Sequence, residues 1–305
     1  MADLLDDRAQ SAPTLPELLA GDEMLLAPGC YDALGARLVE EAGFAAAYMT
    51  GFGSAASRLG RPDVGLMTMP EMVDNARRIA AAVSIPVIAD ADTGYGNPIN
   101  VIRTVQEYEA AGVAAIHIED QVMPKKCGHM DGKHVIPVGE MAAKVRAAVA
   151  ARHRDEFLII ARTDARAVEG LPAALDRARR YRDEGADMLF VEAPQSVAEI
   201  EVIATALAGV PLLFNYAEGG RTPAVTHSLL KELGFKLVIF PIGTLLAATA
   251  AIRALLAQIR EHGSPIDALP TLPRFDRFLE FIGLPEIHEL EHRFADADET
   301  TKETR

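Results

Sequence analysis

The chain has 305 residues, of which half are hydrophobic, and its formal net charge is −14. This length suits one barrel domain with extensions, and the acidic balance argues against a non-specific nucleic-acid binder, which needs a basic face. Cys30 and Cys127 are far apart and do not suggest a disulfide framework. No apolar window has the length of a membrane span or a signal-peptide core. We therefore expect a cytoplasmic protein that binds neither nucleic acid nor membrane.

Eight short apolar runs recur along the chain and predict its fold. Continuous apolar runs are typical of parallel strands that are buried on both faces. Helical patterns lie between the runs, and several of them end at a glycine, the usual residue after a helix. Eight such units predict an α/β fold, a closed (β/α)8 TIM-type barrel rather than an open doubly wound sheet. The runs cover 24–29, 45–51, 86–92, 114–120, 157–164, 187–193, 211–216 and 236–241.

The chain outside the strands is predicted to form four regions. Residues 1–13 are expected to be a flexible N-terminus, 14–263 the catalytic barrel, 264–294 a C-terminal helical extension and 295–305 a disordered tail. The last barrel helix, predicted over 245–262, is more apolar than a helix facing water needs to be. It is covered either by the C-terminal extension or by a neighbouring subunit, and we favour an oligomer.

Acidic residues end the third and fourth runs and suggest a metal site. In the motif 90–96, alternation along an extended segment places Asp90 and Asp92 on the same side. Two close carboxylates repel each other unless a cation lies between them, and Mg²⁺ prefers such oxygen ligands. Glu119 would face the same mouth of the barrel, and Asp63 is a further candidate. The alternative is an acidic loop, with Asp63 as an ordinary turn residue.

The motif Lys125-Lys126-Cys127-Gly128-His129 is the most specific candidate for catalysis. Cationic neighbours stabilise a thiolate, so we expect a lowered pKa for Cys127. Such a cysteine could act as a proton donor or as a nucleophile. Cys30 begins a predicted helix and is interpreted as structural.

Further polar residues at the ends of runs complete a ring. Arg162 suits bidentate binding of a carboxylate, or it forms an ion pair with Glu192. Tyr48 and the loop 50–53 could supply a hydroxyl and backbone N–H groups to an oxyanion. Asn215 ends the seventh run. The other histidines, including His117, are expected to be surface or packing residues, and the arginines over 177–182 are expected to lie on a solvated helix face.

Together these segments identify a resemblance to the isocitrate lyase/phosphoenolpyruvate mutase superfamily. The resemblance covers about residues 14–294 and rests on TGFGSAASRLGRPDVG, DADTGYGN, IHIEDQVMPKKCGH, ARTDA, VEA and NYAEGG. It implies a Mg²⁺-dependent barrel enzyme, with Mn²⁺ also possible. It also implies that the eighth helix swaps between paired subunits, usually in a tetramer, and that the loop carrying Cys127 closes over the substrate.

The resemblance also implies a role for each matching residue. Asp90 would ligate the metal, and its waters would be held by Asp92, Asp63 and Glu119. Cys127 would be the general acid, assisted by a catalytic group of Tyr48, Lys125, His129 and Glu192. The substrate would be bound by Thr50, Gly51, Phe52, Gly128, Arg162 and Asn215.

The reaction that this implies is cleavage of the C2–C3 bond of a 2-hydroxy dicarboxylate, of alkylmalate or methylisocitrate type, to a 2-oxo acid such as pyruvate. Ala217 and Leu246 replace a threonine and an arginine of methylisocitrate lyases, which disfavours a second distal carboxylate. Pro241 counts against oxaloacetate hydrolysis. The alternatives on the same scaffold are a carboxyphosphonoenolpyruvate phosphonomutase, a phosphonopyruvate-type enzyme and an oxaloacetate decarboxylase. A non-catalytic barrel is disfavoured because the motif positions are intact.

Overall fold

The computed structural model describes residue 5 and residues 12–295, which belong to two compact units. One unit comprises residues 8–247, and the other comprises residues 248–305 together with residues 1–7. The predicted flexible N-terminus and disordered tail lie outside the described residues, apart from residues 5, 12, 13 and 295.

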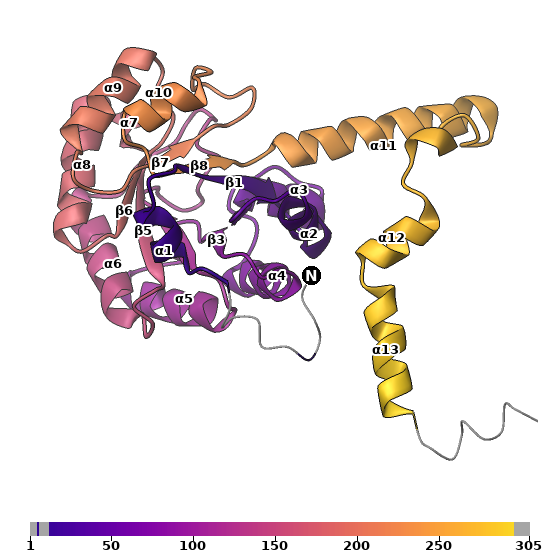
Figure 1. Cartoon of the computed structure of the whole chain (residues 1–305). Coiled ribbons are helices and arrows are strands. Elements are labelled where there is room, and N and C mark those ends of the chain that lie inside the picture. Colours follow the sequence, from indigo (N-terminus) through magenta and orange to yellow (C-terminus); the bar gives the residue numbers. More distant parts are fainter. Residues whose placement is uncertain (1–4, 6–11, 296–305) are drawn as a thin grey trace, which may run out of the picture. The chain divides into compact units, whose positions relative to one another are not determined.

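The unit over residues 8–247 is a barrel of eight parallel strands (Figure 1). Neighbours along the sheet follow the order β6-β5-β4-β3-β2-β1-β8-β7. A parallel bridge between Leu189 and Leu212 then joins β6 to the segment before β7. The predicted (β/α)8 barrel is therefore confirmed. The strands are β1 (Leu25–Cys30), β2 (Ala47–Met49), β3 (Val87–Asp90), β4 (Ala115–Glu119), β5 (Leu158–Thr163), β6 (Met188–Val191), β7 (Leu213–Asn215) and β8 (Leu237–Phe240).

Helices connect successive strands and surround the barrel (Figure 1). The apolar spacing and the capping residues act together to set where these helices begin. Thr226, for example, accepts a hydrogen bond from the N–H of Leu229 at the start of α10. The helices are α1 (Leu15–Ala20), α2 (Ala33–Glu41), α3 (Gly51–Leu59), α4 (Met69–Ala82), α5 (Pro98–Ala110), α6 (Val138–Ala151), α7 (Ala165–Val168), α8 (Leu171–Asp183), α9 (Val197–Ala206) and α10 (His227–Glu232).

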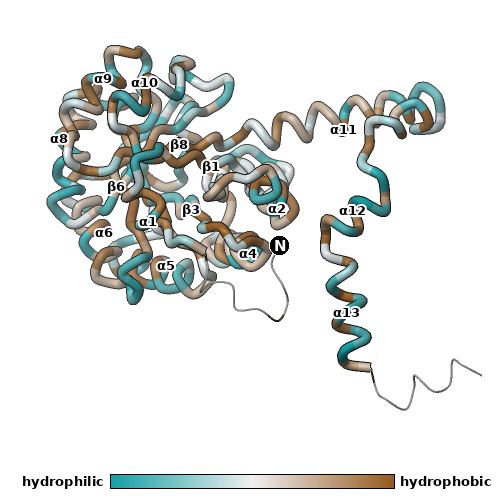
Figure 2. Tube along the Cα trace, viewed as in Figure 1, coloured by the Kyte–Doolittle hydropathy of each residue, from teal (hydrophilic) through white to brown (hydrophobic). Residues whose placement is uncertain are grey.

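Two apolar layers hold the barrel together. An inner cluster includes Ile88, Ile160 and Leu237 from the strands, and Leu15 and Leu19 of α1 pack against it. A larger outer cluster lies between the strands and the surrounding helices. β3 and β8 are coloured as largely hydrophobic in Figure 2, as expected for strands that are buried on both faces.

The segment after β2 differs from the predicted loop, because it forms α3. Thr50 is its N-cap residue, and its side chain accepts a hydrogen bond from the N–H of Gly53 at 3.1 Å. A side chain at Gly53 would collide with Thr50 and Tyr31, so glycine permits this close packing. The first turn of a helix exposes N–H groups that attract anions. Thr50, Gly51 and Phe52 therefore present a helix N-terminus rather than an irregular loop.

The eighth barrel helix, α11 (Gly243–His262), leads into the second unit. It contains no buried side chain. Within residues 264–294, the chain forms the helices α12 (Phe275–Phe281) and α13 (Leu284–Phe294). The interruption between them occurs at Gly283, whose φ of 96° lies in the left-handed region and ends α12. Among the residues described, no helix has both the length and the apolar character needed to cross a membrane.

Candidate active site

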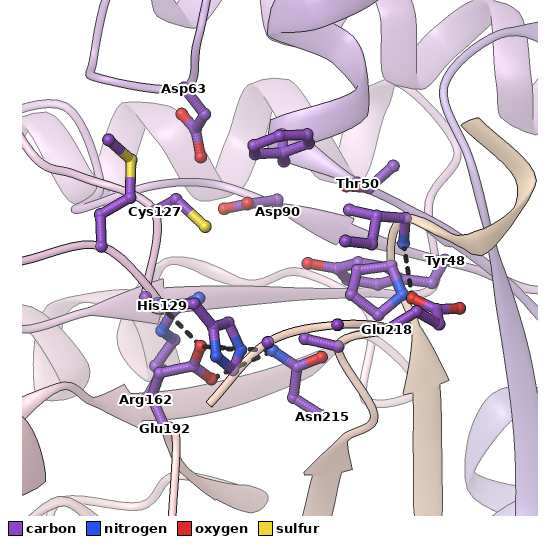
Figure 3. A pocket seen from close by; sticks show the side chains of 18 of the residues that line it. Tyr48, Thr50, Asp63, Asp90, Cys127, His129, Arg162, Glu192, Asn215 and Glu218 are labelled. Carbon is purple, nitrogen blue, oxygen red and sulfur yellow. Dashed lines mark hydrogen bonds and ion pairs between the residues drawn. The ribbon is translucent and has the colours of Figure 1, made fainter. Parts of the chain in front are cut away.

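A cavity of about 230 Å³ opens at the carboxyl ends of the barrel strands, where such barrels place their active sites (Figure 3). Gly51, Asp92 and Glu119, all predicted site residues, are buried but do not line it. The predicted site residues that line the cavity are Tyr48, Thr50, Phe52, Asp63, Asp90, Lys125, Cys127, Gly128, His129, Arg162, Glu192 and Asn215.

Asp90 and Asp92 do not lie on one continuous extended segment, although the sequence pattern predicts that they do. Asp90 ends the strand and lines the cavity, but Asp92 has a φ of 48°, so the segment is no longer extended there. The alternation argument is therefore wrong at Asp92. Its carboxylate lies 2.7 Å from the ammonium of Lys125, which is also 2.7 Å from Asp63. Burial raises the pKa of Asp92 to about 6 despite the attraction of Lys125.

Glu119 carries a deeply buried carboxyl group with an incomplete set of contacts. The residue is 1% exposed, and neither carboxyl oxygen accepts a hydrogen bond, although Oε2 lies 3.2 Å from Nε of Arg162. Burial raises the pKa of Glu119 well above its ordinary value. An acid without hydrogen-bond donors is costly to bury, so this group is suited to a partner that the protein itself does not supply.

The carboxylates around Asp90 suit a hard cation. No three His, Cys, Asp or Glu side chains in the described part of the chain are close enough to hold a metal ion by themselves. Mg²⁺, however, keeps several waters and is often bound through one or two carboxylates. Asp90 faces the cavity, and Glu119 lacks hydrogen bonds. A magnesium ion bound mainly through Asp90 and water therefore fits these residues.

The environment of Cys127 raises the pKa of its thiol, whereas the motif predicts a lowered pKa. It lines the cavity, and Figure 3 shows its side chain among the residues around the opening. Burial raises the pKa of Cys127 to about 11. The prediction of a lowered pKa is wrong because Lys125 is engaged by Asp63 and Asp92, while Lys126 binds backbone carbonyls of its own loop. A thiol with a raised pKa keeps its proton at neutral pH and can donate it as a general acid.

Arg162 lies in a dense network of acids. Its guanidinium binds Asp164 through Nε at 2.9 Å and Nη2 at 3.2 Å, and Nη2 also lies 3.7 Å from Glu192. The predicted ion pair with Glu192 is thus present beside a stronger pair with Asp164. Asn215 donates to Glu192, and His129 Nε2 lies 3.2 Å from the same carboxylate. These contacts orient the polar wall of the cavity (Figure 3).

The hydroxyl of Tyr48 is hydrogen-bonded to a histidine that was expected to be only a surface or packing residue. His117 is completely buried, and its Nε2 lies 2.8 Å from the hydroxyl oxygen of Tyr48 and 3.7 Å from Asp90. Burial lowers the pKa of His117 to about 4, so the ring is neutral at physiological pH. One signal was available, because a histidine interrupts the otherwise apolar strand β4 at the same side-chain parity as Glu119.

The sequence of the barrel matches one family over most of its length. A family described as phosphoenolpyruvate phosphomutase matches residues 15–260. The chain belongs to this family.

The chain is also similar over nearly its whole length to several enzymes. It is 45% identical to 2,3-dimethylmalate lyase of Eubacterium barkeri, over 93% of this chain and 98% of that protein. It is 44% identical to 2-methylisocitrate lyase of Aeropyrum pernix, over 95% and 92%. A structure of oxaloacetate acetylhydrolase with 3,3-difluorooxalacetate superposes with a TM-score of 0.89 at 41% identity, covering 96% of this chain and all of that chain. The chain is an enzyme of the isocitrate lyase/phosphoenolpyruvate mutase superfamily.

Arg177 is buried, although the sequence pattern predicts that it lies on the surface. Arg177 was expected on a solvated helix face, but it is 7% exposed and pairs with Glu169 at 2.8 Å and Asp120 at 3.3 Å. Asp120 also accepts hydrogen bonds from Thr163 and from the backbone N–H of Asp164. The periodicity of α8 could not show this, because the partner acids come from other elements. Through Asp120, Arg177 therefore supports Thr163 and Asp164 at the end of the strand that carries Arg162.

The rest of the cavity lining comes from residues that were not predicted to belong to the site. Ala217 and Pro241 line the cavity, but Leu246 does not and is 48% exposed. Leu246 lies in the first turns of α11, beyond the end of β8. Figure 3 also shows Glu218, whose Oε2 accepts a hydrogen bond from the N–H of Ile242. Further lining residues are Met130, Gly219, Gly220 and Ile242.

Proposed function

We propose that this protein is a Mg²⁺-dependent lyase that cleaves the C2–C3 bond of a 2-hydroxy dicarboxylate of alkylmalate type. The products would be a 2-oxo acid, such as pyruvate, and a second carboxylate. The observation that carries the proposal is that Cys127 lines the same cavity as Asp90 and Arg162, where burial raises the pKa of its thiol. The similarity to 2,3-dimethylmalate lyase supports it.

Each group in the cavity has a chemical task in this reaction. Asp90 would hold the metal, with Asp63, Asp92 and Glu119 holding its waters. When bound, magnesium supplies Lewis-acid stabilisation of negative charge on the oxygen at C2. The N-terminus of α3, with Thr50, Gly51 and Phe52, attracts the adjacent carboxylate through its N–H groups.

The other residues bind the substrate and complete proton transfer. Arg162 would bind the carboxylate of the 2-oxo acid portion, and its contacts with Asp164 and Glu192 limit its rotation. A base in the cavity would take the proton of the C2 hydroxyl, so that this oxygen becomes the carbonyl of the 2-oxo acid as the C2–C3 bond breaks. The electron pair of that bond remains on C3, and the thiol of Cys127 donates its proton to that carbon. Tyr48, Lys125 and His129 surround the reacting atoms, while Gly128 and Asn215 complete the binding wall.

The apolar part of the cavity lining favours a substrate with an alkyl substituent at C3. Phe52, Met130, Ala217, Pro241 and Ile242 are apolar, and all of them line the cavity. A third carboxylate placed among them would lose water without gaining a cation. This favours a dimethylmalate-like substrate over methylisocitrate.

The decisive assay measures pyruvate release from 2,3-dimethylmalate, citramalate, methylisocitrate and isocitrate, with and without EDTA. We expect Mg²⁺-dependent release, with the highest kcat/KM for 2,3-dimethylmalate or another alkylmalate. Oxaloacetate and phosphonopyruvate are assayed in parallel, because the chain is also similar in structure to oxaloacetate acetylhydrolase. Turnover of only those two compounds would replace the proposal with decarboxylase, hydrolase or phosphonate chemistry.

We also propose that the chain functions in the cytoplasm as a homo-oligomer, a dimer of helix-swapped dimers. Both cysteines are free, as expected in a reducing compartment. α11 exposes Ile252 and Leu256, each 57% exposed, which is unfavourable for an isolated helix in water. Sedimentation equilibrium should give a mass about four times the 32.7 kDa of one chain. The double substitution Ile252→Asp and Leu256→Asp should lower that mass. A wild-type protein that sediments as a monomer would contradict the proposal.

A further inference from the structure

A buried lysine that the proposed mechanism does not use joins the Cys127 loop to the substrate-binding arginine. Lys133 exposes 2% of its side chain, and its ammonium lies 2.8 Å from Oδ1 of Asp164. The same ammonium donates a hydrogen bond to the backbone carbonyl of Gly128. Asp164 is itself fully buried and binds Arg162 through both carboxylate oxygens. Lys133, itself a residue of the loop that carries Cys127, thus joins Gly128 of that loop to the Arg162–Asp164 pair.

The loop has a fixed base, and its tip needs separate contacts to stay over the cavity. Residues 121 and 135 form an antiparallel bridge, and the N–H of Val122 donates to the carbonyl of His134 at 2.8 Å. Inside the loop, Gln121 exchanges two hydrogen bonds with Lys126. These bonds hold the loop's own shape and would survive if the whole loop swung away from the barrel.

Contacts between the loop and the barrel are of a different kind. Gly128 packs so closely on Glu192 and Arg162 that a side chain there would collide with both. Its carbonyl oxygen accepts a hydrogen bond from Lys133, which belongs to the same loop, so the Lys133–Asp164 pair is the contact through which Lys133 ties this part of the loop to the barrel. In the closed loop the ammonium of Lys133 balances the buried charge of Asp164, and opening the loop would separate these two charges.

We propose that Lys133 is a positioning residue that holds the Cys127 loop closed and fixes Cys127 relative to Arg162. Cys127 directly precedes Gly128 in sequence, so the Lys133–Gly128 bond restrains the thiol. The Lys133–Asp164 pair restrains the guanidinium through Asp164. The catalytic consequence of this role rests on the proposed lyase function, but the restraint on the loop does not.

The test measures how fast iodoacetamide alkylates Cys127 in the full-length protein, with each cysteine quantified by peptide mass spectrometry. Cys30 is completely buried and serves as the internal reference. Charge-assisted hydrogen bonds to a buried group stabilise enough that Lys133→Met should accelerate alkylation of Cys127 at least about tenfold. Lys133→Arg retains the charge and the donors and should restore slow alkylation.

Lys126→Met is the matched control on the same loop. The ammonium of Lys126 binds only the carbonyls of Asp131 and Gly132 within the loop, so its removal should leave alkylation unchanged. Equal acceleration in Lys126→Met, or no acceleration in a folded Lys133→Met protein, would overturn the proposal. If Lys133→Met does not fold, Lys133→Gln takes its place with the same two outcomes.

A kinetic readout separates positioning from general stability. Where the lyase assay gives turnover, Lys133→Met should lower kcat more than it raises KM, because the proton transfer from Cys127 needs the closed loop. Alkylation needs no substrate. The alkylation experiment therefore tests the role of Lys133 even if the protein shows no lyase activity. Conversely, a negative alkylation result would not bear on the lyase activity.

Discussion

Replacing Cys127 by serine should lower kcat for the preferred 2-hydroxy acid by about 10²–10⁴-fold, the usual contribution of a positioned general acid. A serine hydroxyl occupies nearly the same space but is a much weaker acid, so it cannot protonate the departing carbon at a useful rate. Binding of the 2-oxo acid should change little, because Arg162 and the N-terminus of α3 are untouched. Steady-state kinetics and calorimetric titration with pyruvate would measure the two effects separately.

The Cys127→Ser result has a matched control and a distinct pH signature. Cys30→Ala removes the other thiol, which is buried outside the cavity, and should retain turnover. An acid must be protonated to act, and burial raises the pKa of Cys127 to about 11. Its contribution should therefore be complete at pH 8 and be lost only as the pH rises through about 11. Full activity of Cys127→Ser would remove this residue from the mechanism.

The barrel could be predicted because its signals are local. Each strand is a short apolar run, and a glycine after the preceding helix turns the chain back toward the sheet, as Gly43 and Gly112 do with positive φ. Strand ends then place Asp90, Arg162 and Glu192 at one mouth without any knowledge of side-chain packing. The match of these residues to the cavity follows directly from that topology.

The errors arose where a residue's environment depends on elements distant in sequence. The motif around Cys127 contains two lysines, but Asp63 and Asp92 bind one of them, so the thiol keeps its proton. Arg177 looks like a surface residue until Asp120 from the end of β4 is brought against it. His117 can hydrogen-bond to Tyr48 only because β2 and β4 bring the two side chains together. Burial and partner choice of this kind are not encoded in periodicity.

Replacing Asp90 by asparagine should abolish saturable Mg²⁺ binding together with lyase activity. Asp90 is the predicted direct ligand and lines the cavity, whereas an amide carbonyl brings no charge and holds a hard cation poorly. Isothermal titration of MgCl₂ into the variant, in the absence of substrate, measures binding independently of turnover. The same titration of the wild type after EDTA treatment and dialysis supplies the reference affinity.

Asp92→Asn is the matched comparison, two residues further along the chain. Asp92 does not line the cavity and pairs with Lys125, so it can act on the metal only through water or through charge. Groups of that kind typically change metal affinity by about 10–100-fold, a smaller loss than removal of a direct ligand. Wild-type affinity in Asp90→Asn, or a larger loss in Asp92→Asn than in Asp90→Asn, would show that the metal is bound elsewhere in the carboxylate group. The order of the two affinities therefore tests which aspartate the magnesium ion contacts.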